Sequence, residues 1–322
     1  VYRSSVDGKL YYGSSERWYT ATAYGYTTSN GTRQNISLKA LKDNHSYTET
    51  DDYGNESYYY DSIAIDTSDY VWHYCNYKEY YYRTSLKIPG NILLIHSLSG
   101  SVGSSYSDQS YSNLVHSSDG SLYILKTTGY YSSSTTSKCT LTKVGTISTS
   151  PIQRIVELGG KSKYLLLCQD GSLYLFNNSY NHVSVTRLGA SDVFFTKTEF
   201  FAYGDYNDYS SSDSFYEDVN ESDDKYWCGY YFGVGFIGLD TKGRLWSFGY
   251  NYDGALGNST TAGKNGNTSG LFDALTDVSN GMTYTDFHII KYDDEGVTYD
   301  DGSYSRERVW AATWAMGTDG NL

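Results

Sequence analysis

The chain has 322 residues, of which 38 are Tyr and 32 are Gly but only 2 are Pro and 2 are Met, and its formal net charge is −13. A core that depends on so many aromatic residues is typical of a β-rich chain. The acidic balance excludes a protein that binds nucleic acid through a basic surface, and no apolar run is long enough to span a membrane.

A short phrase recurs along the chain: an apolar run, a turn, and a second run in which apolar and polar residues alternate. Alternation with period 2 on either side of such a turn predicts a β-hairpin, with Gly where a positive φ is needed. The turns fall at Asp7-Gly8, Ser68-Asp69, Asp119-Gly120, Asp170-Gly171, Lys242-Gly243 and Asp319-Gly320. We expect the apolar side chains after the turns to face the core, among them Leu122, Leu173, Leu245 and Trp246.

Each hairpin is flanked by further segments that are typical of strands. Those upstream are Asn35 to Leu41, Asn91 to Leu98, Ile152 to Leu158, Asp192 to Phe201 and Asp286 to Tyr292. With a strand downstream, each unit has four strands, which we call a, b, c and d in chain order. Such units at a spacing of about fifty residues are typical of propeller blades. The sequence therefore predicts an all-β chain, a β-propeller of four-stranded antiparallel blades with six recognisable repeats, the terminal ones incomplete, in a single domain over residues 1–322.

Two stretches carry a resemblance to a known family. Residues 152–176 read IQRIVELGGKSKYLLLCQDGSLYLF, and residues 237–257 read IGLDTKGRLWSFGYNYDGALG. Both resemble the repeat of the regulator-of-chromosome-condensation family, the first through its Gly159-Gly160 bend. The second ends in the family's N-x-x-G-x-L-G pattern, at Asn251, Gly254, Leu256 and Gly257. The usual His after the Gly pair is replaced by Lys163 or its neighbours. The resemblance implies a β-propeller, normally of seven blades, and leaves the function open.

The segments between the other strands are long and lie, by antiparallel geometry, at one end of the blades. The a–b and c–d connections leave a blade at the same end, and the short b–c turns leave at the other. The long a–b segments are residues 42–61, 99–112, 203–231 and 293–308, and the c–d segments are residues 14–31, 76–81, 129–138 and 250–270. We therefore expect all of them to crowd one face.

These long segments are rich in Tyr, Ser, Gly, Asn and Asp, the composition of antibody paratopes. Tyr supplies contact area at a low entropic cost, while the small polar residues supply adaptable hydrogen bonds. The composition predicts a ligand-binding face whose aromatic contacts are Trp18, Tyr24, Tyr53, Tyr58, Tyr106, Tyr130, Tyr209, Tyr216 and Tyr252. Loops of this composition that only cover the ends of the core are the alternative.

The motifs of catalysis and cofactor binding are incomplete. Residues 233–238 match G-x-G-x-x-G, but a strand and not a helix is expected after them, so the glycines indicate close strand packing. The acidic run from Asp205 has Ser210 where a calcium loop needs Gly. We expect no catalytic residue, no metal site and no cofactor. The four cysteines, Cys75, Cys139, Cys168 and Cys228, have no paired spacing and are expected to be free thiols.

The sequence thus favours a non-enzymatic recognition or adhesion module that is extracellular, at a cell surface or on a virion. Its expected partner is a cell-surface glycan or a protein receptor, as for a bacterial adhesin or a phage receptor-binding protein, with no nucleic acid and no membrane insertion. Two alternatives stay open. One is a structural subunit of a filament, sheath or virion that self-assembles through open propeller edges, and the other is a regulatory propeller that promotes guanine-nucleotide exchange.

Overall fold

The computed structural model describes the strands and short turns of the chain and leaves the intervening segments undescribed. The described residues are 2–3, 10–14, 17–20, 22–26, 33–50, 56–75, 80–101, 110–128, 138–158, 163–179, 182–202, 226–229, 234–249, 275–294 and 308–320. They divide between two compact units, residues 1–151 and 152–322, and each unit is described by itself below. None of the described residues belongs to a helix that could cross a membrane.

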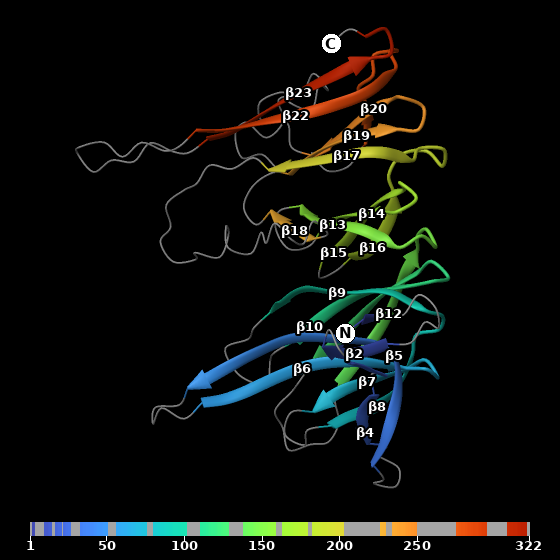
Figure 1. The fold of residues 1–322 in the computed structure, drawn as a ribbon, viewed down its shortest axis with the longest axis vertical. Helices are drawn as coiled ribbons and strands as arrows, with labels where there is room; N and C mark the ends of the chain where they lie inside the picture. The colour runs from blue at the N-terminus through green and yellow to red at the C-terminus, as the bar shows by residue number, and fades with distance from the viewer. Residues whose placement is uncertain are drawn as a thin grey trace, which may run out of the picture. The chain divides into compact units, whose positions relative to one another are not determined.

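The first unit contains three sheets (Figure 1), the first of which has the order β1-β2-β3. Strands β4 to β8 close into a small barrel, and β9 to β12 form a four-stranded antiparallel sheet. The strands are β1 (Tyr2–Arg3), β2 (Leu10–Ser14), β3 (Arg17–Thr20), β4 (Thr22–Tyr26), β5 (Arg33–Thr50), β6 (Glu56–Asp66), β7 (Tyr70–Cys75), β8 (Tyr80–Lys87), β9 (Ile92–Ser101), β10 (Ser110–Ser117), β11 (Ser121–Thr128) and β12 (Lys138–Thr146).

The second unit also contains three sheets, with the orders β16-β15-β14-β13-β18, β17-β19-β20-β21 and β22-β23. Its strands are β13 (Ile152–Leu158), β14 (Lys163–Cys168), β15 (Leu173–Ser179), β16 (His182–Arg187), β17 (Phe195–Ala202), β18 (Tyr226–Gly229), β19 (Val234–Asp240), β20 (Leu245–Gly249), β21 (Thr276–Asp277), β22 (Tyr284–Asp294) and β23 (Arg308–Gly317). The predicted fold class is confirmed in the described residues, which are all-β and of the propeller type, with four-stranded antiparallel sheets at β9–β12 and β17–β21. The expectation of a single domain stays a prediction.

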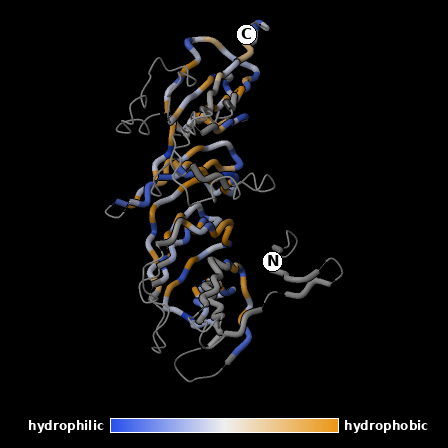
Figure 2. The backbone as a smooth tube through the Cα atoms, turned by 90° about the vertical axis from the view of Figure 1, so that its left-hand side faces the viewer, coloured by the Kyte–Doolittle hydropathy of each residue, from blue (hydrophilic) through white to orange (hydrophobic). Residues whose placement is uncertain are grey.

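The barrel and the β9–β12 sheet share a core cluster, and so do the successive sheets of the second unit, because alternate side chains of each strand point to opposite faces. In the first unit, Ile63 and Ile65 of β6 pack in one core cluster with Ile92 of β9 and Val115 of β10. In the second unit, Leu165 of β14 shares a cluster with residues of the next sheet. Figure 2 shows hydrophobic residues recurring along these strands. The expected core positions Leu122, Leu173 and Leu245 are confirmed as buried. Trp246 is partly buried against the second unit's cluster that contains Leu165.

In the described b–c turns at Asp69, Gly120, Gly171 and Gly243, the residue with positive φ accepts a backbone hydrogen bond from a residue that follows strand d. The carbonyl oxygens of Gly120, Gly171 and Gly243 each accept a bond of 2.8 Å from a backbone N–H, donated by Ile147, Phe195 and Tyr284 respectively. These contacts tie those turns to the part of the chain that follows strand d. The predicted Asp-Gly and Lys-Gly turns are therefore confirmed in the described residues, whereas Asp7-Gly8 lies outside them.

Two of the expected loops are wrong in part. Residues 14–31 contain strands β3 and β4, and residues 42–61 are mostly a long antiparallel hairpin in which β5 runs to Thr50 and β6 begins at Glu56. Paired strands satisfy their backbone N–H and C=O groups by hydrogen bonding to each other, whatever their side chains. A polar, Tyr-rich segment can therefore extend a hairpin beyond the last residue of its apolar pattern.

Two smaller expectations are confirmed. A Cβ added to Gly238, within residues 233–238, would lie 2.4 Å from Cδ1 of Phe195, so this glycine permits close packing between strands. Cys139 and Cys168 are free thiols. The other two cysteines lie in β7 and β18, and their side chains are outside the described part of the chain.

Candidate functional site

The β9–β12 sheet places both of its long connections at one end. Ser110 pairs with Ser101 on one side and with Thr128 on the other, and Thr128 pairs with Lys138. These four residues form one row across the end of the sheet. The segments 102–109 and 129–137 therefore start and finish in this row, while the Asp119-Gly120 turn is at the opposite end.

The second unit repeats this arrangement in two of its sheets. In one, Lys163 pairs with Asn177 and Ser179 pairs with His182, so that segments 159–162 and 180–181 leave the same end. In the other, Gly235 pairs with Gly249 close to the start of β19 and the end of β20. The geometric premise of the predicted binding face holds in these three sheets, because the b–c turn lies at the end opposite the a–b and c–d connections.

The nine predicted contact residues are not brought together by the described residues. Trp18 lies in β3 opposite Gly13, Tyr24 lies in β4 opposite Asn35, and Tyr58 lies in β6 opposite Thr48. All three were expected in loops and belong to strands. The other six lie outside the described residues: Tyr53, Tyr106, Tyr130, Tyr209, Tyr216 and Tyr252. The ligand-binding role of the nine residues stays a prediction.

A feature that the sequence reasoning missed is strand β18 inside the long a–b segment 203–231. Tyr226 to Gly229 pair in parallel with Ile155 to Leu158 of β13, and so add a fifth strand to the preceding sheet. The segment was expected to be loop throughout. Its signal was the uncharged aromatic run from Tyr226, which follows a strongly acidic stretch. The pairing anchors this connection at β13, at one edge of the preceding sheet.

The opposite end of the sheets is closed by a hydrogen-bond network around Asp240. Its Oδ1 accepts the backbone N–H groups of Lys242 and Arg244, and its Oδ2 accepts Nε1–H of Trp246 at 3.0 Å and Nε–H of Arg244 at 2.8 Å. Burial by itself would raise the pKa of this carboxyl, but these bonds outweigh burial and hold the pKa below its usual value of 3.8. The charged carboxylate therefore stabilises the turn.

The same network recurs in the first unit. Asp66 accepts the backbone N–H groups of Ser68 and Tyr70, and Trp72 donates its Nε1–H to Asp66 at 2.8 Å. The pattern D-T-x-x-x-x-W was visible at residues 66–72 and 240–246 but was not recognised as a motif. In both turns the carboxylate and the N–H groups that it accepts are satisfied by one another.

Replacing the charged acceptor should remove the pH dependence of this turn's contribution to the free energy of unfolding. We expect Asp240→Asn to cost about 1.5–3 kcal/mol at pH 7, since hydrogen bonds to a charged group are lost or weakened. The folded pKa is lowered, so the parent has this stability above the unfolded pKa near 3.8 and loses it as the pH falls through the folded pKa. Urea unfolding from pH 7 to pH 2.5 measures this, and a gap between parent and variant that stays constant would contradict it.

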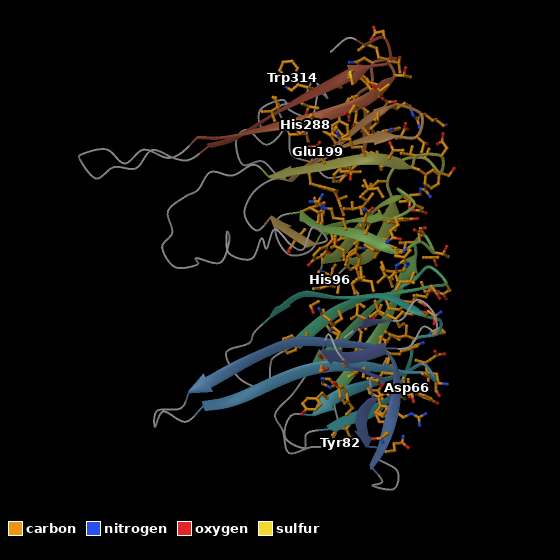
Figure 3. The ribbon with its side chains drawn as sticks, in the orientation of Figure 1. Asp66, Tyr82, His96, Glu199, His288 and Trp314 are labelled. Atoms are coloured by element: carbon orange, nitrogen blue, oxygen red, sulfur yellow. The ribbon has the colours of Figure 1, made fainter. Side chains whose placement is uncertain are left out.

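A second polar group lies on the described surface of the second unit. Lys197 donates to Oδ1 of Asp286 at 2.7 Å, and Nδ1 of His288 is 3.5 Å from Oε1 of Glu199. Hydrogen bonding from Lys197 lowers the pKa of Asp286. Figure 3 shows His288 and Trp314 on the neighbouring strands β22 and β23, with Glu199 on β17. Such exposed pairs contribute little to stability.

The buried titratable groups of the described residues are poorly suited to catalysis. Burial raises the pKa of the Cys168 thiol to about 12, and burial lowers the pKa of His96 to about 4. A thiol that stays protonated is a weak nucleophile, and an imidazole whose pKa is lowered is a weak base. Within the described ranges no three His, Cys, Asp or Glu side chains are grouped so that they could hold a metal ion. The absence of catalysis stays a prediction.

No protein-family model and no curated protein matches the sequence. Among solved structures, the chain is similar to BBS1N in complex with ARL6DN, with 9% identity and a TM-score of 0.30 over 85% of this chain and 66% of that chain. It is similar to the WD40 domain of SCAP from fission yeast, with 8% identity and a TM-score of 0.32 over 84% and 74% of the two chains. For human WBSCR16 the values are 15% and 0.24, over 70% and 52%.

The chain spans less than two thirds of the length of BBS1N and of WBSCR16 in these structures. Likenesses with such low TM-scores carry no argument about family or function. The resemblance to the regulator-of-chromosome-condensation repeat therefore stays a prediction.

Proposed function

We propose that this chain is a non-enzymatic recognition module that binds a cell-surface glycan or a protein receptor, outside the cell, at a cell surface or on a virion. The contact is made through the Tyr-rich segments between strands a and b and between strands c and d. A glycan suits this composition, because aromatic faces stack on sugar rings while Asp and Asn side chains bond the hydroxyl groups.

The observation that supports this proposal is the separation of the two ends of each sheet. In the β9–β12 sheet, the row Ser101, Ser110, Thr128 and Lys138 collects two segments that contain Tyr106 and Tyr130 at one end. The other end holds the hydrogen-bonded turns. A scaffold of packed sheets that presents variable connections at one end is a common design for recognition proteins.

A binding screen tests the proposal. The purified chain is applied to a glycan array and, in parallel, to intact bacterial and animal cells, with folding verified by β-type circular dichroism. We expect binding to a restricted set of glycans or cells. A folded chain that binds nothing in either format would contradict the proposal.

Substitution then locates the contact. We expect at least one of Tyr106→Ala, Tyr130→Ala and Tyr252→Ala to weaken binding by about 2 kcal/mol or more, because few aromatic anchors dominate most interfaces. The matched control is Lys242→Ala at the turn end, where the Lys242 side chain is 53% exposed and pairs only with the exposed Asp192 among the described ion-pair partners. Titration of the ligand from the screen measures all four variants. Equal affinities across the set would contradict the assignment of the face.

A further inference from the structure

A tight turn with Asn280 and Gly281 at its centre lies between β21 and β22. Both residues have positive φ, 51° and 78° respectively. The N–H of Met282 donates to the carbonyl oxygen of Ser279 at 3.0 Å and so closes the turn. Positive φ at both central residues defines a type I′ turn, for which Asn-Gly is a favoured pair. The turn geometry therefore explains why Asn occupies a position that strains most residues with a Cβ.

The Asn280-Gly281 pair is exposed and unsupported by neighbours. Both residues are exposed, although Ser279 just before them is only 3% exposed. A Cβ added to Gly281 would have no atom within 4 Å, whereas one added to Gly189 would lie 3.1 Å from Cβ of Val193. Among the described residues, no hydrogen bond engages the N–H of Gly281 or the side-chain amide of Asn280. Both groups are therefore free to react with one another.

We propose that Asn280 is a site of spontaneous deamidation and isoaspartate formation. The backbone nitrogen of Gly281 loses its proton to water or hydroxide and attacks Cγ of Asn280. This attack forms the N–Cγ bond of a cyclic succinimide and releases Nδ2 as ammonia. Water then opens one of the two C–N bonds of the ring and leaves an aspartyl or an isoaspartyl residue, with no change of oxidation state. Glycine favours the attack, because no Cβ shields its nitrogen.

The Asp-Gly turns between strands b and c are protected from the same reaction. Oδ1 of Asp119 accepts the N–H of Ser121 at 2.8 Å, and this hydrogen bonding lowers the pKa of the carboxyl. A charged carboxylate is a poor target for a nucleophile. Gly120 is also buried, and its carbonyl oxygen is bonded to the N–H of Ile147. The neutral, exposed amide of Asn280 has neither protection.

The isoaspartyl product alters the turn itself. It carries the main chain through Cβ and Cγ, which lengthens the backbone by one atom and adds one negative charge. The bond between Ser279 and Met282 fits a turn of two ordinary residues, so the longer backbone disrupts it. Oγ of Ser279 also accepts the N–H of Leu245 at 2.8 Å. The modification therefore weakens the attachment of this connection to β20.

This inference is independent of the proposed recognition function, and peptide mapping of the aged parent chain tests it. A protease that cleaves before Asp isolates residues 277–285, which exclude the other Asn-Gly pairs at 30–31 and 265–266. The isoaspartyl product resists this protease and leaves the peptide intact but about 1 Da heavier, because an NH is exchanged for an O. The aspartyl product is cut at position 280. We expect both products to accumulate with time, and faster at pH 9 than at pH 7.

Two variants locate the reaction in this pair. Asn280→Gly removes the amide and keeps a residue that adopts positive φ readily, so the products should be lost. Gly281→Ala keeps the amide but places a Cβ beside the attacking nitrogen, so the products should form several-fold more slowly. Asn177 is the control within the parent chain, because its Oδ1 accepts the N–H of Ser179 at 3.0 Å. It should stay unmodified.

The unfolded chain provides the reference rate. The parent is aged in parallel in urea, where the Asn-Gly pair reacts without any influence of the fold. A folded parent that stays unconverted at pH 9 while the unfolded chain converts at position 280 would overturn the inference. Conversion of Gly281→Ala at the rate of the parent would overturn it as well.

Discussion

Phe236→Ala is expected to destabilise the chain by about 3–5 kcal/mol, the cost of deleting a fully buried aromatic side chain and leaving a cavity. Phe236 is 0% exposed and belongs to the cluster that joins the β13–β16 and β17–β21 sheets. Its ring is 5.1 Å from the ring of Phe195, edge to face, and 5.1 Å from the ring of Phe200. These contacts join strands β17 and β19, and no small side chain can replace them.

Urea unfolding, followed in the transition that reports unit 152–322, measures this effect. Val183→Ala is the matched control, because Val183 lies in the same unit but is 39% exposed on β16. This change should stay within about 0.5 kcal/mol of the parent, as surface substitutions do. If Phe236→Ala cost no more than the control, the two sheets would not be packed through this cluster.

The blades could be predicted from the sequence because their signals are local. A b–c hairpin needs a positive φ at one residue, and Gly or Asp69 supplies it within a short span of alternating residues. The apolar runs on either side locate strands a to d, and Ile152 to Leu158 was predicted with its observed bounds. Packing between sheets then follows, because each buried face must be covered.

The remaining elements could not be predicted because their stabilisation comes from distant partners. Strand β18 exists through its pairing with β13, far away in the sequence, and β4 pairs in parallel with β8. Neither segment shows the alternation that marks a blade strand.

The candidate site could likewise be predicted only in part. Antiparallel order alone predicts that the a–b and c–d segments leave one end of a sheet, and the row from Ser101 to Lys138 agrees with it. The side-chain arrangement of a Tyr-rich segment depends on contacts that carry no periodic signal. For this reason the contact residues require the binding measurements described above.

Gly171→Ala is expected to cost about 3 kcal/mol or more, through two effects that a control can separate. Gly171 has a φ of +83, where a residue with a Cβ costs about 1–2 kcal/mol. The added Cβ would also lie 2.4 Å from the carbonyl oxygen and 2.7 Å from the nitrogen of Phe195. Those are backbone atoms, so the turn must move. The 2.8 Å bond from the N–H of Phe195 to the carbonyl of Gly171 is then weakened, at about 1 kcal/mol.

The control is Gly320→Ala, because Gly320 has a φ of +81 but no described atom lies within 4 Å of the Cβ it would gain. It should show the conformational cost alone, about 1–2 kcal/mol. Chemical denaturation of both variants gives the difference, which measures how strongly the b–c turn is fitted to the next sheet. Equal losses at the two glycines would mean that the turn yields freely, and that the bonds from the turns to the following sheets do not fix the blade spacing.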